Sequence, residues 1–358
     1  MPLNTDFTAI PEGSSRLGHL MTPLLDPTSA AGRGTTVTYP LSPQAMRPLW
    51  FLPDWWTSEV TLVIAGILNL AYCIADNTDG RQARRTKRST FIGEYLDHGL
   101  DCVTSLMSAM LLATALGASV PLACVGVLAV SCATSLCHTV NHETGVMIWG
   151  NDYLSVDEAM IAFGVGLWVP VLYPAVYTVQ VPEVLLFGIL PSGLKVVDVA
   201  YVLYILAQFQ VCYTLYSVKR SILARPATLF IALNALFFVF MMPHPHYKSG
   251  ALTSAKAYSG VCACIVAWVE SNFSYPAILS ITVAATSSMI CHMPIVAKCA
   301  GLAVAGTAPL GGVVLVWLLF ASNPVWGVIA AVSLHIFQVL FNIQLVQKTK
   351  EAAAANKK

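Results

Sequence analysis

Long apolar segments, following one another from residue 58 to residue 346, restrict most strongly what this chain can fold into. A helix needs about 20 predominantly apolar residues to cross the hydrocarbon core of a bilayer. Because backbone groups in lipid must be hydrogen-bonded internally, segments of this composition cross as helices. The sequence therefore predicts an all-α fold, a polytopic integral membrane helix bundle with about nine transmembrane helices. The expected spans are Ser58–Asp76, Val103–Ser119, Leu122–Thr139, Ala159–Val179, Val196–Tyr216, Pro226–Met242, Tyr275–Val296, Gly301–Phe320 and Pro324–Val346.

The composition agrees with a membrane protein and excludes several other classes. Hydrophobic residues make up 56% of the 358 residues and charged residues only 10%, whereas a soluble domain is about 25% charged. This charge deficit argues against an ordinary soluble enzyme and against a disordered chain. The 19 basic residues are not gathered into one stripe, so we expect no nucleic-acid partner.

Basic residues indicate which side of the membrane each connection occupies. The densest basic cluster lies at residues 81–88, and the positive-inside rule places it in the cytosol. A tenth apolar stretch, Ala257–Val269, is too short to cross and is interpreted as re-entrant or interfacial. With nine spans, the C-terminal lysines are also cytosolic.

A block of polar residues after the first span contains two pairs of aspartates. Asp76 and Asp79 are spaced i,i+3, and Asp97 and Asp101 are spaced i,i+4, so each pair lies on one face of its helix. We expect a loop of about a dozen residues between the helices, which lets the pairs face one cleft at the cytosolic surface. Four carboxylates repel one another unless cations neutralise them, and oxygen ligands suit Mg²⁺ or Mn²⁺, with two ions supporting phosphoryl chemistry.

Small residues and one arginine accompany these carboxylates. Gly80 and Ala83 share the face of the first pair, where small side chains let a bulky ligand approach the backbone. Arg84 follows Gly80 by one turn and is placed to meet a phosphate. Gly93 has the same role as a small residue on the second helix.

The spacing D-x2-D-G-x2-A-R-x8-G-x3-D-x3-D, from Asp76 to Asp101, resembles the signature of the CDP-alcohol phosphotransferase family. The segments Asp79–Thr86 and Gly93–Asp101 are similar to its eukaryotic choline/ethanolamine branch. Pro53–Trp56 and Trp149–Asp152 favour the ethanolamine members of that branch.

The resemblance implies a transferase that moves phosphoethanolamine from CDP-ethanolamine to diacylglycerol, or to an alkyl-acylglycerol, releasing CMP. It also implies that the four aspartates hold two Mg²⁺ or Mn²⁺ ions and that Gly80, Ala83 and Arg84 hold the CDP portion. Other members suggest a homodimer in the endoplasmic reticulum or Golgi membrane, with the active site facing the cytosol. On this basis we divide the chain into an N-terminal tail (1–52), a catalytic core (53–158), C-terminal transmembrane helices (159–346) and a cytosolic tail (347–358).

The family pattern offers two candidates for the base that deprotonates the lipid hydroxyl. Asp101 is the fourth aspartate of the signature, and His98 lies beside it. Glu94 precedes His98 by four residues on the same helical face, from which a carboxylate can orient the imidazole and raise its basicity. We therefore favour His98 slightly, with Asp101 as the alternative.

Several alternatives stay open at this stage. CDP-choline, or both CDP-alcohols, could be the donor. The family has a further N-terminal helix, and residues 1–50 contain no long apolar run, which raises the hypothesis of a catalytically silent regulatory paralogue. A transporter is less consistent with the sequence, because transporters bind substrates near the bilayer midplane and the carboxylates here lie at a helix boundary.

Overall fold

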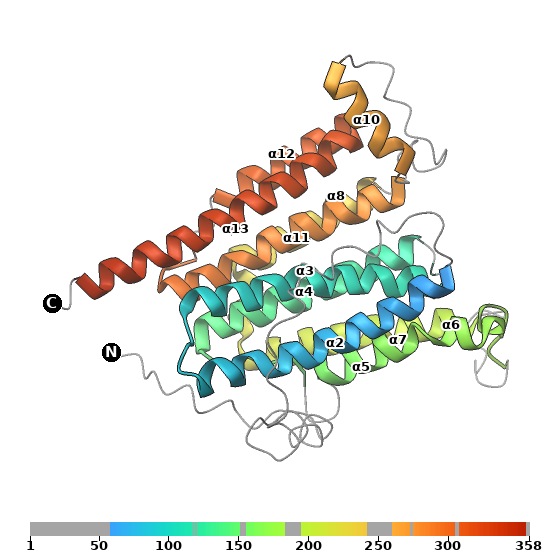
Figure 1. Ribbon diagram of the computed structural model, residues 1–358, viewed down its shortest axis with the longest axis horizontal. Helices are drawn as coiled ribbons and strands as arrows, with labels where there is room; N and C mark the ends of the chain where they lie inside the picture. Colours follow the sequence, from blue (N-terminus) through green and yellow to red (C-terminus); the bar gives the residue numbers. More distant parts are fainter. Residues whose placement is uncertain are drawn as a thin grey trace. The chain divides into compact units, whose positions relative to one another are not determined.

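The computed structural model describes residues 58–116, 118, 120–150, 155–182, 195–241, 260–272, 275–304 and 308–355 (Figure 1). The N-terminal tail predicted for residues 1–52 and the end of the predicted C-terminal tail lie outside these residues. The described part contains helices and no β-strand, only two isolated bridges. The all-α prediction is confirmed. The structure consists of two compact units, and each is described by itself.

The first unit comprises residues 1–90, 112–118 and 143–218. Its longest helix, α2 (Ser58–Arg85), packs against α5 (Val156–Gly166) and α6 (Val169–Leu172), and α7 (Val196–Val218) contacts the 3₁₀ helix η4 (Pro174–Tyr177). The contact with α2 is close at Gly66, where an added Cβ would lie 2.2 Å from Trp168 Nε1. Trp168 Nε1 also donates to the backbone oxygen of Val63 at 3.2 Å, which fixes the register of α6 on α2.

The second unit comprises residues 91–111, 119–142 and 219–358. It holds most of α3 (Phe91–Ala115) and α4 (Val120–Thr144), the 3₁₀ helix η6 (Arg220–Ala224), and the helices α8 (Pro226–Met241), α10 (Gly260–Asn272), α11 (Tyr275–Ala300), α12 (Ala308–Ser322) and α13 (Pro324–Ala355). Helix α11 packs on α8, α12 and α13. Within an apolar stretch of 18 residues in this helix, 89% of the residues are buried, so α11 is the central helix of this unit.

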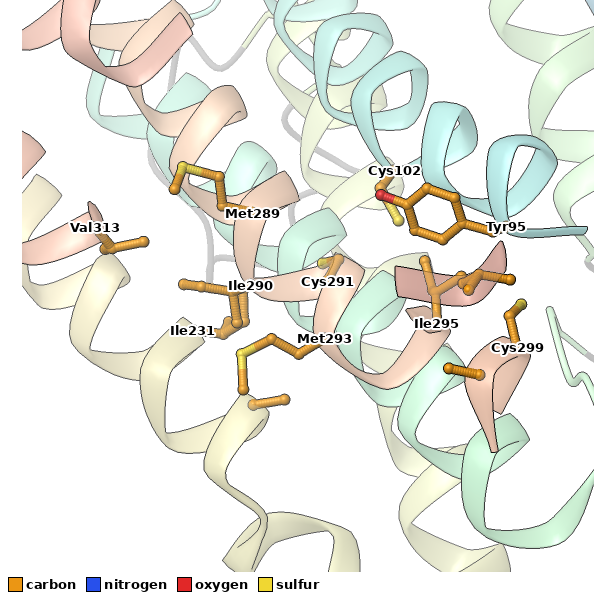
Figure 2. Close-up of a cluster of buried hydrophobic side chains, with 13 residues drawn as sticks. Tyr95, Cys102, Ile231, Met289, Ile290, Cys291, Met293, Ile295, Cys299 and Val313 are labelled. Atoms are coloured by element: carbon orange, nitrogen blue, oxygen red, sulfur yellow. The ribbon is translucent and has the colours of Figure 1, made fainter. Parts of the chain in front are cut away.

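The core of the second unit is a cluster of buried apolar side chains (Figure 2). Tyr95 and Cys102 of α3 lie in it with Met289, Ile290 and Cys291 of α11. Residues separated by almost two hundred positions therefore share one core, and α3 is tied to α11 by direct packing.

Four described helices are long and apolar enough to cross a membrane: residues 59–85, 196–218, 278–300 and 324–355. The chain therefore has the composition of an integral membrane protein, as predicted, while the count of nine spans is not confirmed. Helix α13 continues to Ala355, nine residues beyond the expected end of the last span at Val346.

One expected span is wrong as a continuous helix. The predicted span Ala159–Val179 is divided among α5, α6 and η4. Pro170 lies at the start of α6 and Pro174 at the start of η4. A proline has no backbone N–H to donate and is tolerated in the first turn of a helix, so each proline starts a new segment.

Candidate functional site

The first aspartate pair lies on α2, close to its C-terminal end. Asp76 and Asp79 are half-buried, and the helix continues past them to Arg85. Two polar neighbours are accommodated because Asn77 Nδ2 donates to Cys73 O and Thr78 Oγ1 to the carbonyl one turn before it, each at 2.9 Å. Such bonds satisfy polar side chains within the helix itself. The predicted i,i+3 pair therefore stands on regular helix.

The small residue that follows this pair lies under an arginine side chain. A Cβ added at Gly80 would lie 3.3 Å from Arg84 Nη1, so the guanidinium extends over the glycine. Arg84 is exposed, whereas Ala83 is half-buried. A planar guanidinium binds phosphate oxygens through two parallel hydrogen bonds. The helix thus places a guanidinium on the side of Gly80, and its role in phosphate binding stays a prediction.

The connection between the two aspartate-bearing helices is shorter than expected. The sequence suggested a loop of about a dozen residues, but only residues 86–90 lie between the end of α2 and the start of α3. Helix α2 extends further because Gln82, Ala83 and the two arginines after them favour helix. It ends where Lys87 adopts a positive φ of 55° and the Arg88 N–H donates to Ala83 O at 2.9 Å.

The second aspartate pair lies on α3. Asp97 and Asp101 are half-buried, and each offers a carboxylate oxygen within 4.8 Å of the other. Two hard oxygen ligands at this separation could share one cation, and their chemistry fits Mg²⁺ or Mn²⁺. The metal-ligating role of this pair stays a prediction.

His98 lies beside this pair with one uncommitted nitrogen. Its Nδ1 is buried without a hydrogen-bond partner among the described residues, and its Nε2 is 4.0 Å from Asp97 Oδ2. Burial lowers the pKa of His98 to about 4, against the opposing effect of the Glu94 charge. The imidazole is therefore neutral near pH 7 and has a free lone pair, but its lowered pKa makes it a weaker base than a solvent-exposed histidine.

Glu94 makes a different contact from the one expected. Its Oε1 accepts a hydrogen bond from Lys298 Nζ of α11 at 2.7 Å, with side chains only 19% and 27% exposed. The carboxylate is thus committed to an ion pair between α3 and α11, and no Glu94–His98 hydrogen bond is seen in the described part of the chain. Glu94 influences His98 through its charge.

The remaining predicted residues keep the status of predictions. Gly93 is exposed in the first turn of α3. Asp76 and Asp79 belong to the first unit, and Asp97 and Asp101 to the second. Each unit supports its own pair, and the joining of all four carboxylates around two ions stays a prediction.

Sequence reasoning missed three residues that contact side chains of α3. Lys298 pairs with Glu94; the His138 ring of α4 lies 5.6 Å from the His98 ring, between centroids; and His292 of α11 contacts Tyr95. His138 and His292 each occur within an apolar segment. An ionisable residue in a membrane segment is rare and marks functional or structural importance, so this signal was present in the sequence.

Comparison with known proteins matches the part of the chain that carries these features. Residues 44–190 match the family model described as CDP-alcohol phosphatidyltransferase. Ethanolaminephosphotransferase 1 of Homo sapiens is 32% identical over 140 residues, which cover 35% of this chain and 34% of that protein. Ethanolaminephosphotransferase 1 of Mus musculus is 51% identical over 51 residues, covering 14% of this chain and 11% of that protein. The matches thus span about a third or less of these relatives, and the resemblance predicted from the signature is confirmed for this segment.

Proposed function

We propose that this chain transfers phosphoethanolamine from CDP-ethanolamine to the free hydroxyl of diacylglycerol or an alkyl-acylglycerol, forming phosphatidylethanolamine and CMP. The match of residues 44–190 to the CDP-alcohol phosphatidyltransferase model carries the proposal. The named relatives favour ethanolamine as the headgroup. The basic residues at the end of α2 favour an active site on the cytosolic side of the membrane. The family resemblance suggests that this membrane is that of the endoplasmic reticulum or Golgi.

In this proposal the two aspartate pairs come together around the diphosphate of the donor. Asp76 and Asp79 approach from α2, and Asp97 and Asp101 from α3. The match of residues 44–190, which contain all four aspartates, to the family model supports this arrangement. Bound Mg²⁺ or Mn²⁺ would neutralise the diphosphate and stabilise CMP as the leaving group.

The protein side chains then orient the donor and accept the proton. Arg84, lying over Gly80, binds a phosphate oxygen of the CDP portion. The lipid hydroxyl oxygen attacks the phosphorus that bears ethanolamine, and the bond from that phosphorus to the CMP oxygen breaks. His98 takes the hydroxyl proton, because one of its nitrogens has no other partner in the described residues; Asp101 is the alternative base.

The test uses the purified full-length chain in lipid nanodiscs with labelled CDP-ethanolamine and diacylglycerol. We expect labelled phosphatidylethanolamine with Mg²⁺ or Mn²⁺, none after chelation, and recovery when the ion is restored. Asp97→Asn should lower kcat by about 100-fold or more. The matched control is Asp198→Asn, at a half-buried aspartate in the first turn of α7 outside the site, and it should keep full activity.

Two results would contradict the proposal. A wild-type chain that forms no phospholipid with either ion would exclude the activity and favour a silent regulatory protein. Competition between CDP-ethanolamine and CDP-choline checks the headgroup, and a preference for CDP-choline would overturn the ethanolamine assignment while leaving the reaction class intact.

A further inference from the structure

A buried polar network ties α3 to two helices far along the sequence. Tyr95 Oη lies 2.9 Å from His292 Nδ1 of α11 and 3.0 Å from Asn342 Nδ2 of α13. All three residues are at most 5% exposed. Because an amide N–H can only donate, Tyr95 Oη accepts from Asn342. In the His292 tautomer whose Nδ1 carries no proton, Tyr95 donates its own proton to that nitrogen. Tyr95 thus links α13 to α11 through its hydroxyl group.

The backbone of α3 lies against the same histidine. A Cβ added at Gly99 would lie 2.6 Å from His292 Cε1, closer than a Cβ can approach another heavy atom without displacement. Glycine therefore lets the imidazole pack directly on the helix backbone, one turn after Tyr95. The two contacts hold α3 at successive turns of the same face.

The carboxylate pair lies on the opposite face of this helix. With about 100° per residue, Tyr95 and Gly99 are only about 40° apart around the axis. Asp97 and Asp101 are about 200° and 240° from Tyr95 in the same projection. The buried face that contacts α11 therefore determines the direction in which the carboxylates project.

Small rotations of α3 have large effects on the carboxylates. An oxygen ~5 Å from the helix axis moves by about 2 Å when the helix rotates by about 20°. Misplacement of a reacting or ligating group by about 1 Å can cost ~100-fold in rate. A rigid hydrogen bond on the buried face limits this rotation.

We propose that His292 is a positioning residue, which fixes the rotation of α3 through Tyr95 and Gly99 and so holds Asp97 and Asp101 in ligating orientation. The proposal rests on the function proposed above, because it assigns a divalent cation to these carboxylates. His292 acts on them through α3 and does not itself touch the cation or substrate.

The primary test measures Mn²⁺ affinity by electron paramagnetic resonance on the purified full-length chain. His292→Leu and Tyr95→Phe should each weaken Mn²⁺ binding by about 10-fold or more, the scale found when an outer partner of a metal ligand is removed. Compared with His292→Leu, the variant His292→Asn should keep most of the Mn²⁺ affinity, because the asparagine amide oxygen can occupy the position of Nδ1 and accept from Tyr95. In turnover assays, kcat should fall with little change in KM for the lipid acceptor.

The matched control is Tyr275→Phe. Tyr275 is also fully buried in the second unit and donates to Met241 O at 3.2 Å, away from α3. Loss of the Tyr275 hydroxyl group should lower the melting temperature about as much as Tyr95→Phe does, without weakening Mn²⁺ binding. Equal Mn²⁺ affinity in Tyr95→Phe, His292→Leu and Tyr275→Phe would overturn the positioning role, as would a wild-type chain that binds no Mn²⁺.

A reciprocal variant tests the contact with the helix backbone. Gly99→Ala should weaken Mn²⁺ binding, and addition of His292→Asn should recover part of it, because the shorter side chain makes room for the new methyl group. No recovery in the double variant would contradict the contact. A wild-type chain that binds Mn²⁺ but shows no turnover would refute the proposed function alone, since the Mn²⁺ comparisons still decide the role of His292.

Discussion

At the scale of single residues, the ion pair between Glu94 and Lys298 shows how a charged residue of the signature region serves the fold. Both side chains are half-buried, and their atoms meet at 2.7 Å across a separation of 204 residues. A carboxylate removed from water needs a cation or hydrogen-bond donors to offset the lost hydration. Glu94 has such a partner in Lys298, which also ends α11 with a positive charge near its C-terminus.

Removal of the lysine should therefore destabilise the protein through the remaining carboxylate. We expect Lys298→Met to lower the melting temperature by about 2–4 °C, the shift that corresponds to about 1 kcal/mol for a partly exposed pair. The double variant Glu94→Gln/Lys298→Met should recover part of this loss, because no unpaired charge remains. Lys348→Met, at an exposed lysine of α13, is the control. Scanning fluorimetry measures all four proteins, and equal losses in the single and double variants would contradict the pairing.

At the scale of secondary structure, the ends of the helices determine where functional residues stand. Prolines divide residues 156–177 into three short segments, although hydropathy alone suggested one span. Helix α2 does the opposite and continues through a strongly polar stretch to Arg85. This continuation places Asp79, Gly80 and Arg84 on regular helix, where their spacing fixes their relative directions.

The end of α2 offers a test of this account. Lys87 has a positive φ of 55°, the only such non-glycine residue in the described part of the chain. That conformation costs an L-residue about 1–2 kcal/mol and costs glycine nothing, so Lys87→Gly should raise the melting temperature by a few degrees. Arg88→Gly, one residue later, gains no such relief and should lower it. Lower stability in Lys87→Gly than in wild type would show that α2 ends differently.

At the scale of the whole molecule, hydropathy and charge describe a chain that belongs in a membrane. Four described helices are long and apolar enough to cross. The boundaries of the two compact units, one of which lies between α2 and α3, differ from those of the predicted regions 53–158 and 159–346. The predicted regions were defined by expected function, and they stay predictions. Sidedness rests on the basic cluster at residues 81–88, which the positive-inside rule assigns to the cytosol.

The predicted topology places the connection after α2 and the C-terminus on the same side of the membrane. In a background with Cys262 and Cys264 changed to alanine, Ser89→Cys and Lys358→Cys should both react with a membrane-impermeant maleimide on sealed microsomes, whose outer face is cytosolic. Labelling before and after detergent gives the accessible fraction. Reaction of one site only after detergent would show that the number of spans between them is odd, which contradicts the assignment of nine.

The sequence by itself determined the membrane class, the helical fold and the two aspartate pairs with their accompanying glycine and arginine. Hydropathy and helical spacing are local properties, so a short window of residues contains them in full. Tertiary structure alone decided that Lys298 pairs with Glu94 and that His292 packs on Gly99 and hydrogen-bonds to Tyr95. Those partners come from helices about two hundred residues apart in the chain, and a helix face does not specify in its own sequence which other helix will cover it.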